Sequence, residues 1–363
     1  MNSKKLKLPV FACVLALSPL LAGADEAAPE EASDFSLSGY IDSSYYYLTG
    51  SGTFTSGVPT RAFDRKRENR FDLQTFAVTA SYLPKQGLGG LLDLNFGNDA
   101  DVIAPFHTPA NDQFDIQAGY LQYATGPFTA IAGKFVTLAG AEVIKSPSDV
   151  NFSRSILFGY AIPFSHTGAR LSYALNDKMS FMIGLNKGWD VLQDNNSSNT
   201  MELGASLGLA DSFTLFLDAY SGKEPGNTGI QGTRNLIDMV GTYTVSDALS
   251  LVLNYDYAKQ SDAIDAGQDA TWSGLAAYAN YKFNDKWRLS LRGEYFDDKD
   301  GYRTGVAQKW KEATLTLAYL PNESLEFRGE VRADKSDKNA FLNTDGTTDS
   351  TQRSFGIEAL IKF

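Results

Sequence analysis

The sequence predicts an all-β protein, a transmembrane antiparallel β-barrel of about sixteen strands with short periplasmic turns and long external loops. Three observations predict this fold class. The chain begins with an export signal, its later segments alternate between apolar and polar residues with a period of two, and its connections alternate between short and long. Together they indicate the outer membrane of a Gram-negative cell.

The first 24 residues have the composition of a cleaved signal peptide. Lys4, Lys5 and Lys7 form a basic region, residues 9–21 form an apolar stretch, and residues 22–24 (Ala-Gly-Ala) are the small residues of a cleavage site. A membrane anchor is the alternative, but the apolar stretch is short and is followed by acidic residues. The chain thus divides into a cleaved signal peptide (1–24), a flexible acidic leader (25–34) and the barrel (35–363).

The composition of the remaining chain excludes several functions. The one cysteine, Cys13, lies in the signal peptide, so disulfides, thiol chemistry and cysteine metal sites are excluded. Without the three signal-peptide lysines the chain has 29 basic and 43 acidic residues, and this net charge of −14 disfavours nucleic acid as a partner. No later segment approaches the roughly 18 apolar residues of a spanning helix. We expect no cofactor and no metal.

Residues 325–334 (LEFRGEVRAD) show the alternation most clearly. Leu325, Phe327 and Val331 alternate with glutamates and arginines. So much charge does not fit the packed core of a soluble sandwich, but it fits a water-filled lumen behind a face that contacts lipid. The same alternation recurs in residues 213–218, 249–257 and 287–295.

The connections between these segments are of two kinds that alternate along the chain. Seven short turns begin near residues 84, 126, 176, 211, 246, 284 and 321. Eight longer polar segments lie on either side of them: 49–68, 98–112, 137–163, 190–199, 222–233, 260–270, 298–309 and 336–350. Seven turns and eight loops join sixteen strands with both chain ends on the turn side, which is the outer-membrane arrangement.

The C-terminal segment ends on an aromatic residue. Every second residue is apolar up to the last position: Phe355, Ile357, Ala359, Ile361 and Phe363. Such an ending resembles the insertion signal that the barrel assembly machinery reads in outer-membrane proteins, and an ordinary amphipathic last strand is the alternative. We therefore expect Phe363 to be needed for assembly.

Two rival architectures fit less well. A soluble sandwich would bury one apolar face against another, whereas here tyrosine, tryptophan and phenylalanine cluster near strand ends, as interfacial girdles do. A solenoid needs a fixed sequence period of 20 to 50 residues, and none is found.

Residues 137–163 depart from the composition of the other external loops. The segment includes an apolar run at 156–158 (Ile-Leu-Phe), which is unsuited to a loop surrounded by water. We therefore expect this third external loop to pack inside the barrel.

Four charged residues of this loop are candidates for pore function. Glu142 and Asp149 are expected to face the channel, and Lys145 and Arg154 to pair locally. The alternative for Arg154 is a structural one, in which it holds the loop to the wall by hydrogen bonds.

The inward positions of the strands add basic candidates on the wall. They are Lys134 and Arg170 on the strands beside the loop, and Arg288, Arg292, Arg328 and Arg332 on strands far around the barrel. A basic arc facing an acidic loop would set up a transverse field that filters solutes by charge. Each arginine could instead pair with a wall carboxylate such as Glu294 or Glu330, because structural ion-pair networks are common.

Three stretches resemble a known family. Residues 139–175 (AGAEVIKSPSDVNFSRSILFGYAIPFSHTGARLSYAL) resemble the OmpL-like β-barrel porins, and residues 36–47 (SLSGYIDSSYYY) and 72–99 fit the same family. The likeness covers nearly all of residues 35–363. It implies an outer-membrane barrel with a general or solute-specific pore, and no catalytic residues. In sixteen-strand porins the third loop narrows the pore, which the resemblance implies for residues 137–163.

The expected function is passive diffusion of ions and small hydrophilic solutes, with a solute-specific channel as the near alternative. An outer-membrane enzyme is disfavoured, because only His107 and His166 remain as imidazole bases and no catalytic motif surrounds them. A surface receptor or adhesin is a third class. Expected partners are outer-membrane lipid and lipopolysaccharide, the barrel assembly machinery and small hydrophilic solutes, and the chain is expected as a homotrimer or as an isolated barrel.

Overall fold

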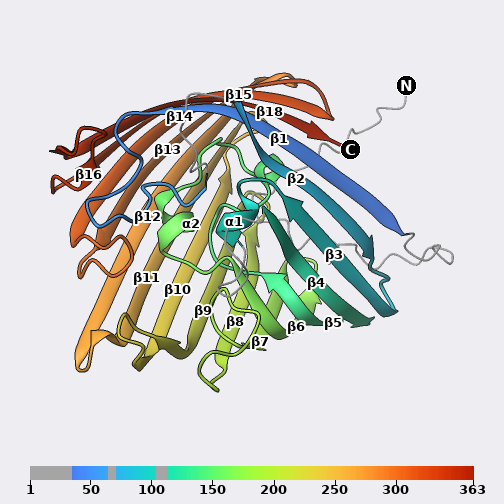
Figure 1. Ribbon diagram of the computed structural model, residues 1–363. Coiled ribbons are helices and arrows are strands. Elements are labelled where there is room, and N and C mark those ends of the chain that lie inside the picture. The colour runs from blue at the N-terminus through green and yellow to red at the C-terminus, as the bar shows by residue number, and fades with distance from the viewer. Residues whose placement is uncertain (1–34, 64–70, 104–112) are drawn as a thin grey trace.

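A computed structural model describes residues 35–63, 71–103 and 113–363, and in it sixteen strands close into one antiparallel barrel (Figure 1). The predicted fold class is confirmed, whereas the signal peptide and the leader lie outside the described residues. The barrel strands are β1 (Ser36–Leu48), β2 (Phe71–Tyr82), β3 (Gly87–Phe96), β4 (Phe114–Thr125), β5 (Phe128–Val136), β6 (Ser165–Asn176), β7 (Met179–Asn186), β8 (Thr200–Ala210), β9 (Phe213–Pro225), β10 (Gln231–Thr244), β11 (Leu249–Asp265), β12 (Gln268–Asn284), β13 (Trp287–Asp298), β14 (Gln308–Asn322), β15 (Leu325–Ser336) and β18 (Thr351–Lys362).

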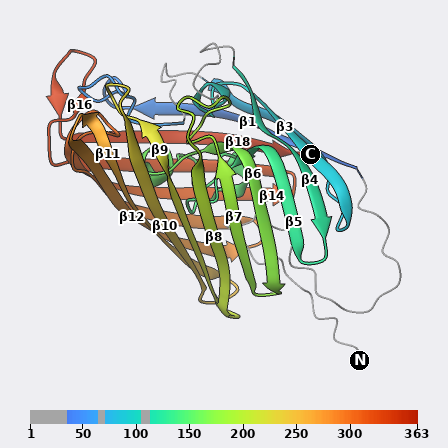
Figure 2. The ribbon, with the colours of Figure 1, turned by 90° about the horizontal axis from the view of Figure 1, so that it is seen from below.

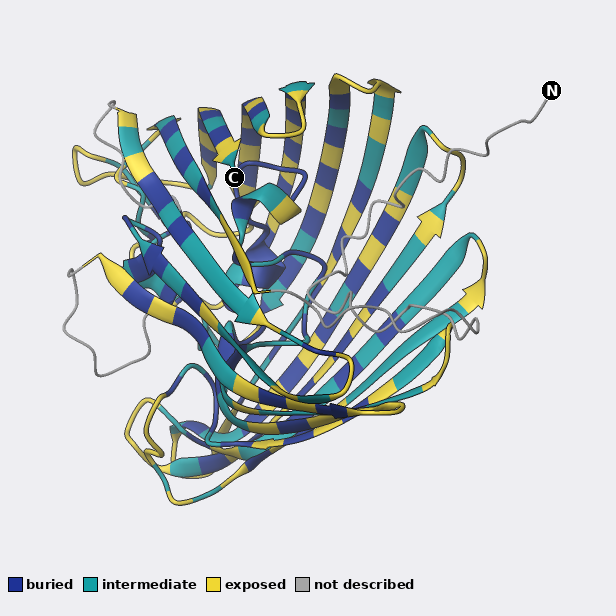
Figure 3. Ribbon diagram, turned by 90° about the vertical axis from the view of Figure 1, so that its right-hand side faces the viewer, coloured by how far each residue is buried: buried dark blue, intermediate teal, exposed yellow. Residues whose placement is uncertain are grey.

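The burial of the strands is the reverse of that in a soluble protein. In β15 the charged residues Glu326 and Arg328 are each 2% exposed, whereas Phe327 is 43% and Val331 51% exposed. The bands of buried and exposed residues alternate along most strands (Figure 3). Apolar side chains therefore point outward, where lipid replaces water, and polar side chains point into the barrel.

One end of the barrel has only short connections. The seven turns at that end, for example residues 126–127 and 211–212, contain two to four residues each, and neighbouring strands such as β6 to β10 lie side by side (Figure 2). Two of the eight long loops predicted for the other end are wrong. Instead of loops at 222–233 and 260–270, β9 to β12 continue, and β11 and β12 meet in a two-residue turn at 266–267.

Aromatic side chains gather on the outer surface next to the short turns. Trp287 packs on Tyr319 with ring centroids 4.7 Å apart, and Phe128 packs on Tyr173 at 4.8 Å. These residues lie at or within three residues of strand ends at the turn side, where an aromatic girdle meets the membrane interface.

The barrel closes where the last strand pairs with the first. Beyond the register of β18 with β1, the backbone N–H and C=O of Phe363 bond to Gly39 at 3.0 and 2.8 Å. The Phe363 ring stacks on Phe76 of β2 at 6.4 Å and lies so close to Gly39 that a Cβ there would come within 2.7 Å of it. The terminal residue thus covers the seam between β1 and β18.

Few elements are not barrel strands. They are α1 (Ala100–Ile103), the 3₁₀ turn η1 (Ser146–Ser148), α2 (Ile156–Tyr160) and the hairpin of β16 (Phe341–Leu342) with β17 (Thr348–Asp349). Within the described ranges, no helix is long and apolar enough to cross a membrane. Figure 1 shows α2 within the ring of strands.

An apolar cluster occupies part of the barrel interior. Ile156, Leu157 and Phe158 of α2 are at most 2% exposed, and they belong to one cluster with inward residues of six neighbouring strands. Those wall residues are Phe216, Leu236, Val240, Val252, Trp272, Phe296 and Trp310. Burial of this apolar area favours contact between the loop and the wall from β9 to β14.

Candidate functional site

The segment between β5 and β6 follows the inner wall for much of its circumference. The Leu138 N–H donates to the Tyr220 hydroxyl of β9 at 3.0 Å, and Ser146 donates to Asp42 of β1 at 2.7 Å. Asn151 then donates to Thr316 of β14 at 2.7 Å. The segment therefore crosses the barrel from β9 to β1 and returns along β15 to β12.

Glutamates of the wall hold the backbone N–H groups of this loop. Glu330 of β15 accepts from Phe152 N at 2.8 Å and Ser153 N at 3.1 Å. Glu294 of β13 accepts from Ile156 N at 2.9 Å and Leu157 N at 3.1 Å, at the start of α2. A carboxylate in this position satisfies donors that have no partner within the helix.

Arginines of the wall hold the loop carbonyl groups in the same way. Arg328 donates to the carbonyl oxygens of Ser146, Asp149 and Asn151 at 2.8 to 3.1 Å. Arg292 donates to Ser153 O at 2.6 Å. Arg332 donates to Arg154 O at 2.8 Å, and Arg288 donates to Val150 O at 3.4 Å.

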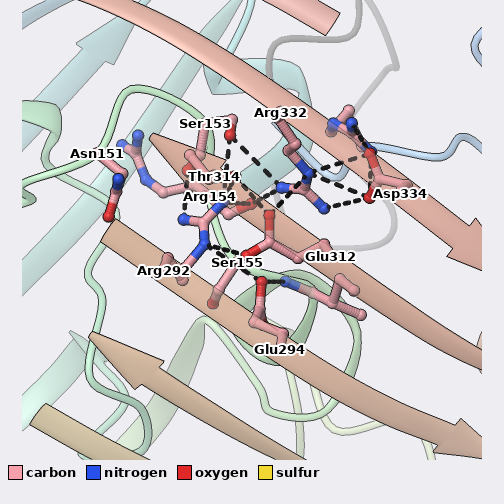
Figure 4. Close-up of polar contacts among 12 residues, drawn as sticks. Asn151, Ser153, Arg154, Ser155, Arg292, Glu294, Glu312, Thr314, Arg332 and Asp334 are labelled. Atoms are coloured by element: carbon pink, nitrogen blue, oxygen red, sulfur yellow. Dashed lines mark hydrogen bonds and ion pairs between the residues drawn. The ribbon is translucent and has the colours of Figure 1, made fainter. Parts of the chain in front are cut away.

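Carboxylates balance these arginines, so the contact between loop and wall is an ion-pair network (Figure 4). Arg292 lies 2.8 Å from Glu312, and Arg332 lies 2.8 Å from Asp334. A buried charge that is paired and hydrogen-bonded is tolerated, whereas removal of one partner leaves an uncompensated charge. The network therefore holds the loop firmly in one position.

The two acidic loop candidates do not face an open channel, contrary to the expectation from the sequence. Glu142 is 4% exposed, pairs with Arg292 at 2.7 Å and accepts from Ser155 N at 2.6 Å. Asp149 is 2% exposed and pairs with Arg154 at 2.9 Å. Burial raises the pKa of Asp149 to about 7, although Arg154 opposes this rise.

Arg154 lies against the loop itself. It donates to the carbonyl oxygens of Val143 and Phe152 at 3.0 and 3.2 Å, and to Ser146 Oγ at 3.1 Å. The local pairing expected for Arg154 is therefore present, with Asp149 at 2.9 Å, and these hydrogen bonds hold the loop together.

The expectation that an open pore separates a basic arc of the wall from an acidic loop is wrong as well. Arg288, Arg292, Arg328 and Arg332 touch the loop directly. On the other side of the barrel, Arg170 pairs with Glu202, and Lys134 pairs with Asp115 at 2.7 Å where the pairing of β4 with β5 ends. The alternative expected from the sequence, pairing of these arginines with wall carboxylates, is present instead. Arg288 and Arg328 pair with Glu326, and Arg332 pairs with Asp334.

Lys145 differs from the other charged loop residues because water reaches it. Its side chain is 34% exposed, while its ammonium pairs with Asp93 of β3 at 2.9 Å and donates to Thr79 of β2 at 2.8 Å. The local pairing expected for Lys145 is therefore wrong. Ser148, three residues on, is also exposed. The edge 143–148 of the loop thus borders accessible space near β2 and β3.

A row of carboxylates on the opposite wall was not selected from the sequence. Asp218, Asp238 and Asp256 lie side by side in register on β9, β10 and β11, and each is at most 4% exposed. Asn254 donates to Asp238 and accepts from Ala141 N, which brings loop residues 138–141 over the row. The period-two alternation predicts that these three positions face inward, but it does not predict that loop residues 138–141 cover them.

The described ranges contain no group of three or more histidine, cysteine, aspartate or glutamate residues arranged to hold a metal ion. His166, one of the two imidazoles, is fully buried and stacks on Tyr220 with ring centroids 4.8 Å apart. Its Nδ1 lies 3.1 Å from Gly188 O. The other imidazole, His107, lies outside the described residues.

The comparisons with known proteins agree with this architecture. The family model described as "Putative beta-barrel porin-2, OmpL-like" matches residues 34–363. No curated protein sequence matches the chain.

Solved barrels are similar in fold but distant in sequence. The outer membrane channel DcaP of Acinetobacter baumannii shares 15% identity at a TM-score of 0.64, over 91% of this chain and 97% of that one. OmpT of Vibrio cholerae shares 15% identity at a TM-score of 0.62, over 93% of this chain and 100% of that one. The anion-selective porin from Comamonas acidovorans shares 11% identity at a TM-score of 0.66, over 92% of this chain and 100% of that one. At these identities the likeness shows the fold.

Proposed function

Because the chain belongs to the OmpL-like β-barrel porin family, we propose that it is a passive channel through which ions and small hydrophilic solutes cross the outer membrane. A closed barrel of sixteen strands is wide enough to leave an aqueous path beside an inserted loop. Its polar inner wall keeps such a path wet.

In this proposal the free path passes the exposed side of Lys145, where the loop edge 143–148 meets the wall of β2 and β3. The observation that carries it is the difference in exposure within one loop. The Lys145 side chain is 34% exposed, whereas Glu142 and Asp149 are 4% and 2% exposed. Charge selectivity is therefore set by the Lys145–Asp93 pair rather than by the buried carboxylates.

Planar-bilayer recordings of the purified protein test the path. The wild type should give steady ohmic steps, and Lys145→Glu should shift the reversal potential in a potassium chloride gradient toward cation selectivity. Lys178→Glu is the matched control, because Lys178 is an exposed lysine of a periplasmic turn. Equal shifts in both variants would contradict the path, and silence from a folded wild-type barrel would contradict the channel.

No catalytic step is part of the proposal. The buried position of His166, stacked on Tyr220, supports a structural role for this imidazole. A solute-specific channel differs from a general one only in the affinity of sites along the path.

A homotrimer is also part of the proposal. One of the similar structures is a trimer form of the Vibrio cholerae OmpT. Analytical ultracentrifugation of the protein in detergent distinguishes three chains from one, and conductance steps that occur in threes would support the trimer independently.

A further inference from the structure

Two arginines at the external end of the barrel differ from the other buried arginines. In the described part of the chain, seven buried arginines pair with carboxylates: Arg61, Arg154, Arg170, Arg288, Arg292, Arg328 and Arg332. Arg234, which is 8% exposed, and Arg303, which is half-buried, have no carboxylate within ion-pair distance in those ranges. Buried arginine without an anionic partner is uncommon, because desolvation is costly.

The two guanidinium groups lie around the same indole ring. Arg234, near the start of β10, lies 4.7 Å from the ring centroid of Trp189, and Arg303 of the β13–β14 connection lies 5.9 Å from it. Arg303 also lies 5.3 Å from the ring of Trp272. Aromatic faces stabilise the two cations in place of a carboxylate. Burial and the neighbouring charge of Arg234 lower the pKa of Arg303 to about 10.

Part of each guanidinium group is free to bind. Arg234 donates through Nε to Gln260 at 2.6 Å and through Nη2 to the Tyr302 hydroxyl at 3.1 Å, which leaves Nη1. Among the residues that the structure describes, the Arg303 side chain donates only through Nε, to Tyr160 O, which leaves both terminal nitrogens. None of these three nitrogens is among the fully buried atoms that lack a partner, so solvent reaches them.

Three carboxylates lie near the pair, and each accepts hydrogen bonds from other donors through at least one of its oxygens. Asp190 accepts from the N–H groups of Phe164 and Ser165, both at 2.8 Å. Glu224 accepts from Trp189 N at 3.1 Å and from the Thr200 hydroxyl at 3.3 Å. Asp298 accepts from the N–H groups of residues 303 and 304 and from the Thr304 hydroxyl. These contacts soften the positive potential without occupying the terminal nitrogens of the two arginines.

We propose that Arg234 and Arg303 form a binding subsite for small oxyanions, such as carboxylate-bearing solutes, at the external mouth of the barrel. The planar fork of a guanidinium group matches the two oxygens of a carboxylate. This inference extends the proposed channel function by naming a class of solute, and its test measures binding on the folded protein without any conductance.

The test is titration of the detergent-solubilised protein with sodium acetate and, separately, with inorganic phosphate, at constant ionic strength. Tryptophan emission should change and saturate, because both arginines lie on tryptophan rings. Arg234→Gln and Arg303→Gln should each weaken apparent affinity about tenfold or more, and Arg303→Lys should weaken it less. Arg353→Gln is the matched control, since Arg353 is an exposed arginine on β18.

Each outcome decides the proposal. Heat-modifiable migration in gels identifies variants that still fold. If a glutamine variant fails to fold, the affinity of Arg303→Lys is measured in its place. The absence of a saturable change, or affinity equal to that of the wild type in the folded Arg234→Gln and Arg303→Gln variants, would overturn the subsite. Binding that persists in a protein without conductance would contradict the channel and leave the subsite intact.

Discussion

Arg328 shows how single residues fix the position of the loop. It donates to three loop carbonyl oxygens, and Glu326 and Glu358 balance its charge at 2.7 and 3.1 Å. Arg328→Met removes all three bonds and takes the arginine away from Glu358, while Glu326 keeps its pair with Arg288 at 2.6 Å. Loss of one partner of a buried ion pair typically costs about 3–5 kcal/mol. We expect larger and noisier conductance steps, and Arg353→Met should leave the steps unchanged. Conductance steps of wild-type size and noise in the Arg328 variant would show that other contacts are enough to hold the loop in position.

The buried carboxylates lead to a second prediction at this scale. The sequence predicts that Glu142 and Asp149 face the channel, and in that position their neutralisation would shift ion selectivity toward anions. In the structure both side chains are buried. We now expect Glu142→Gln/Asp149→Asn to keep the reversal potential of the wild type. Asp149→Asn should be the milder single change, because the pKa of Asp149 is already raised to about 7. A clear anion shift in the double variant would restore the first expectation.

The sequence could predict which residues point inward, but not what they touch. Period-two alternation is local, so Arg292 and Arg328 were correctly placed on the wall. Their partners lie in a loop about 140 to 180 positions away along the chain. Only the closed barrel brings these segments together, and no local pattern specifies which carbonyl group faces which arginine.

At the scale of elements, β18 depends on Phe363, the residue that follows it. Removal of Phe363 breaks two backbone bonds to Gly39 and the ring contact with Phe76 at the seam where the barrel closes. We expect the truncated protein to reach the outer membrane in much lower amount, measured as heat-modifiable protein in membrane fractions. Phe363→Tyr keeps the ring and should assemble normally. Equal yields of wild type and truncation would contradict this role.

The sequence predicts the parts of strands that cross the lipid better than the parts that extend past it. The alternation of residues 325–334 reflects lipid on one side and lumen on the other, and β15 covers that segment. The polar composition of residues 222–233 and 260–270 predicts loops there. Outside the lipid either face of a strand can be polar, so alternation fades while backbone pairing continues, as in β11 and β12.

At the scale of the whole molecule, the barrel and its inserted loop are separable. Val136 and Ser165 pair directly, and Thr137 N bonds to Phe164 O at 3.0 Å, so a two-residue Asn-Gly turn can replace residues 138–163. We expect the shortened chain to fold into a heat-modifiable barrel with several-fold larger conductance. Its thermal stability should fall, because the apolar wall around Trp272 and Phe296 loses its cover. Failure to fold would show that the loop is required for closure.

The unequal strands give the barrel a tall side and a low side. The 17 residues each of β11 and β12 extend about 56 Å along the strand, or roughly 43 Å upright at the usual tilt, against an apolar band of about 25 Å. The nine residues of β5 give only about 23 Å upright by the same arithmetic. The tip at residues 266–267 therefore stands clear of the bilayer, where antibodies and phage tail fibres approach a cell, and it is the natural place for a displayed epitope.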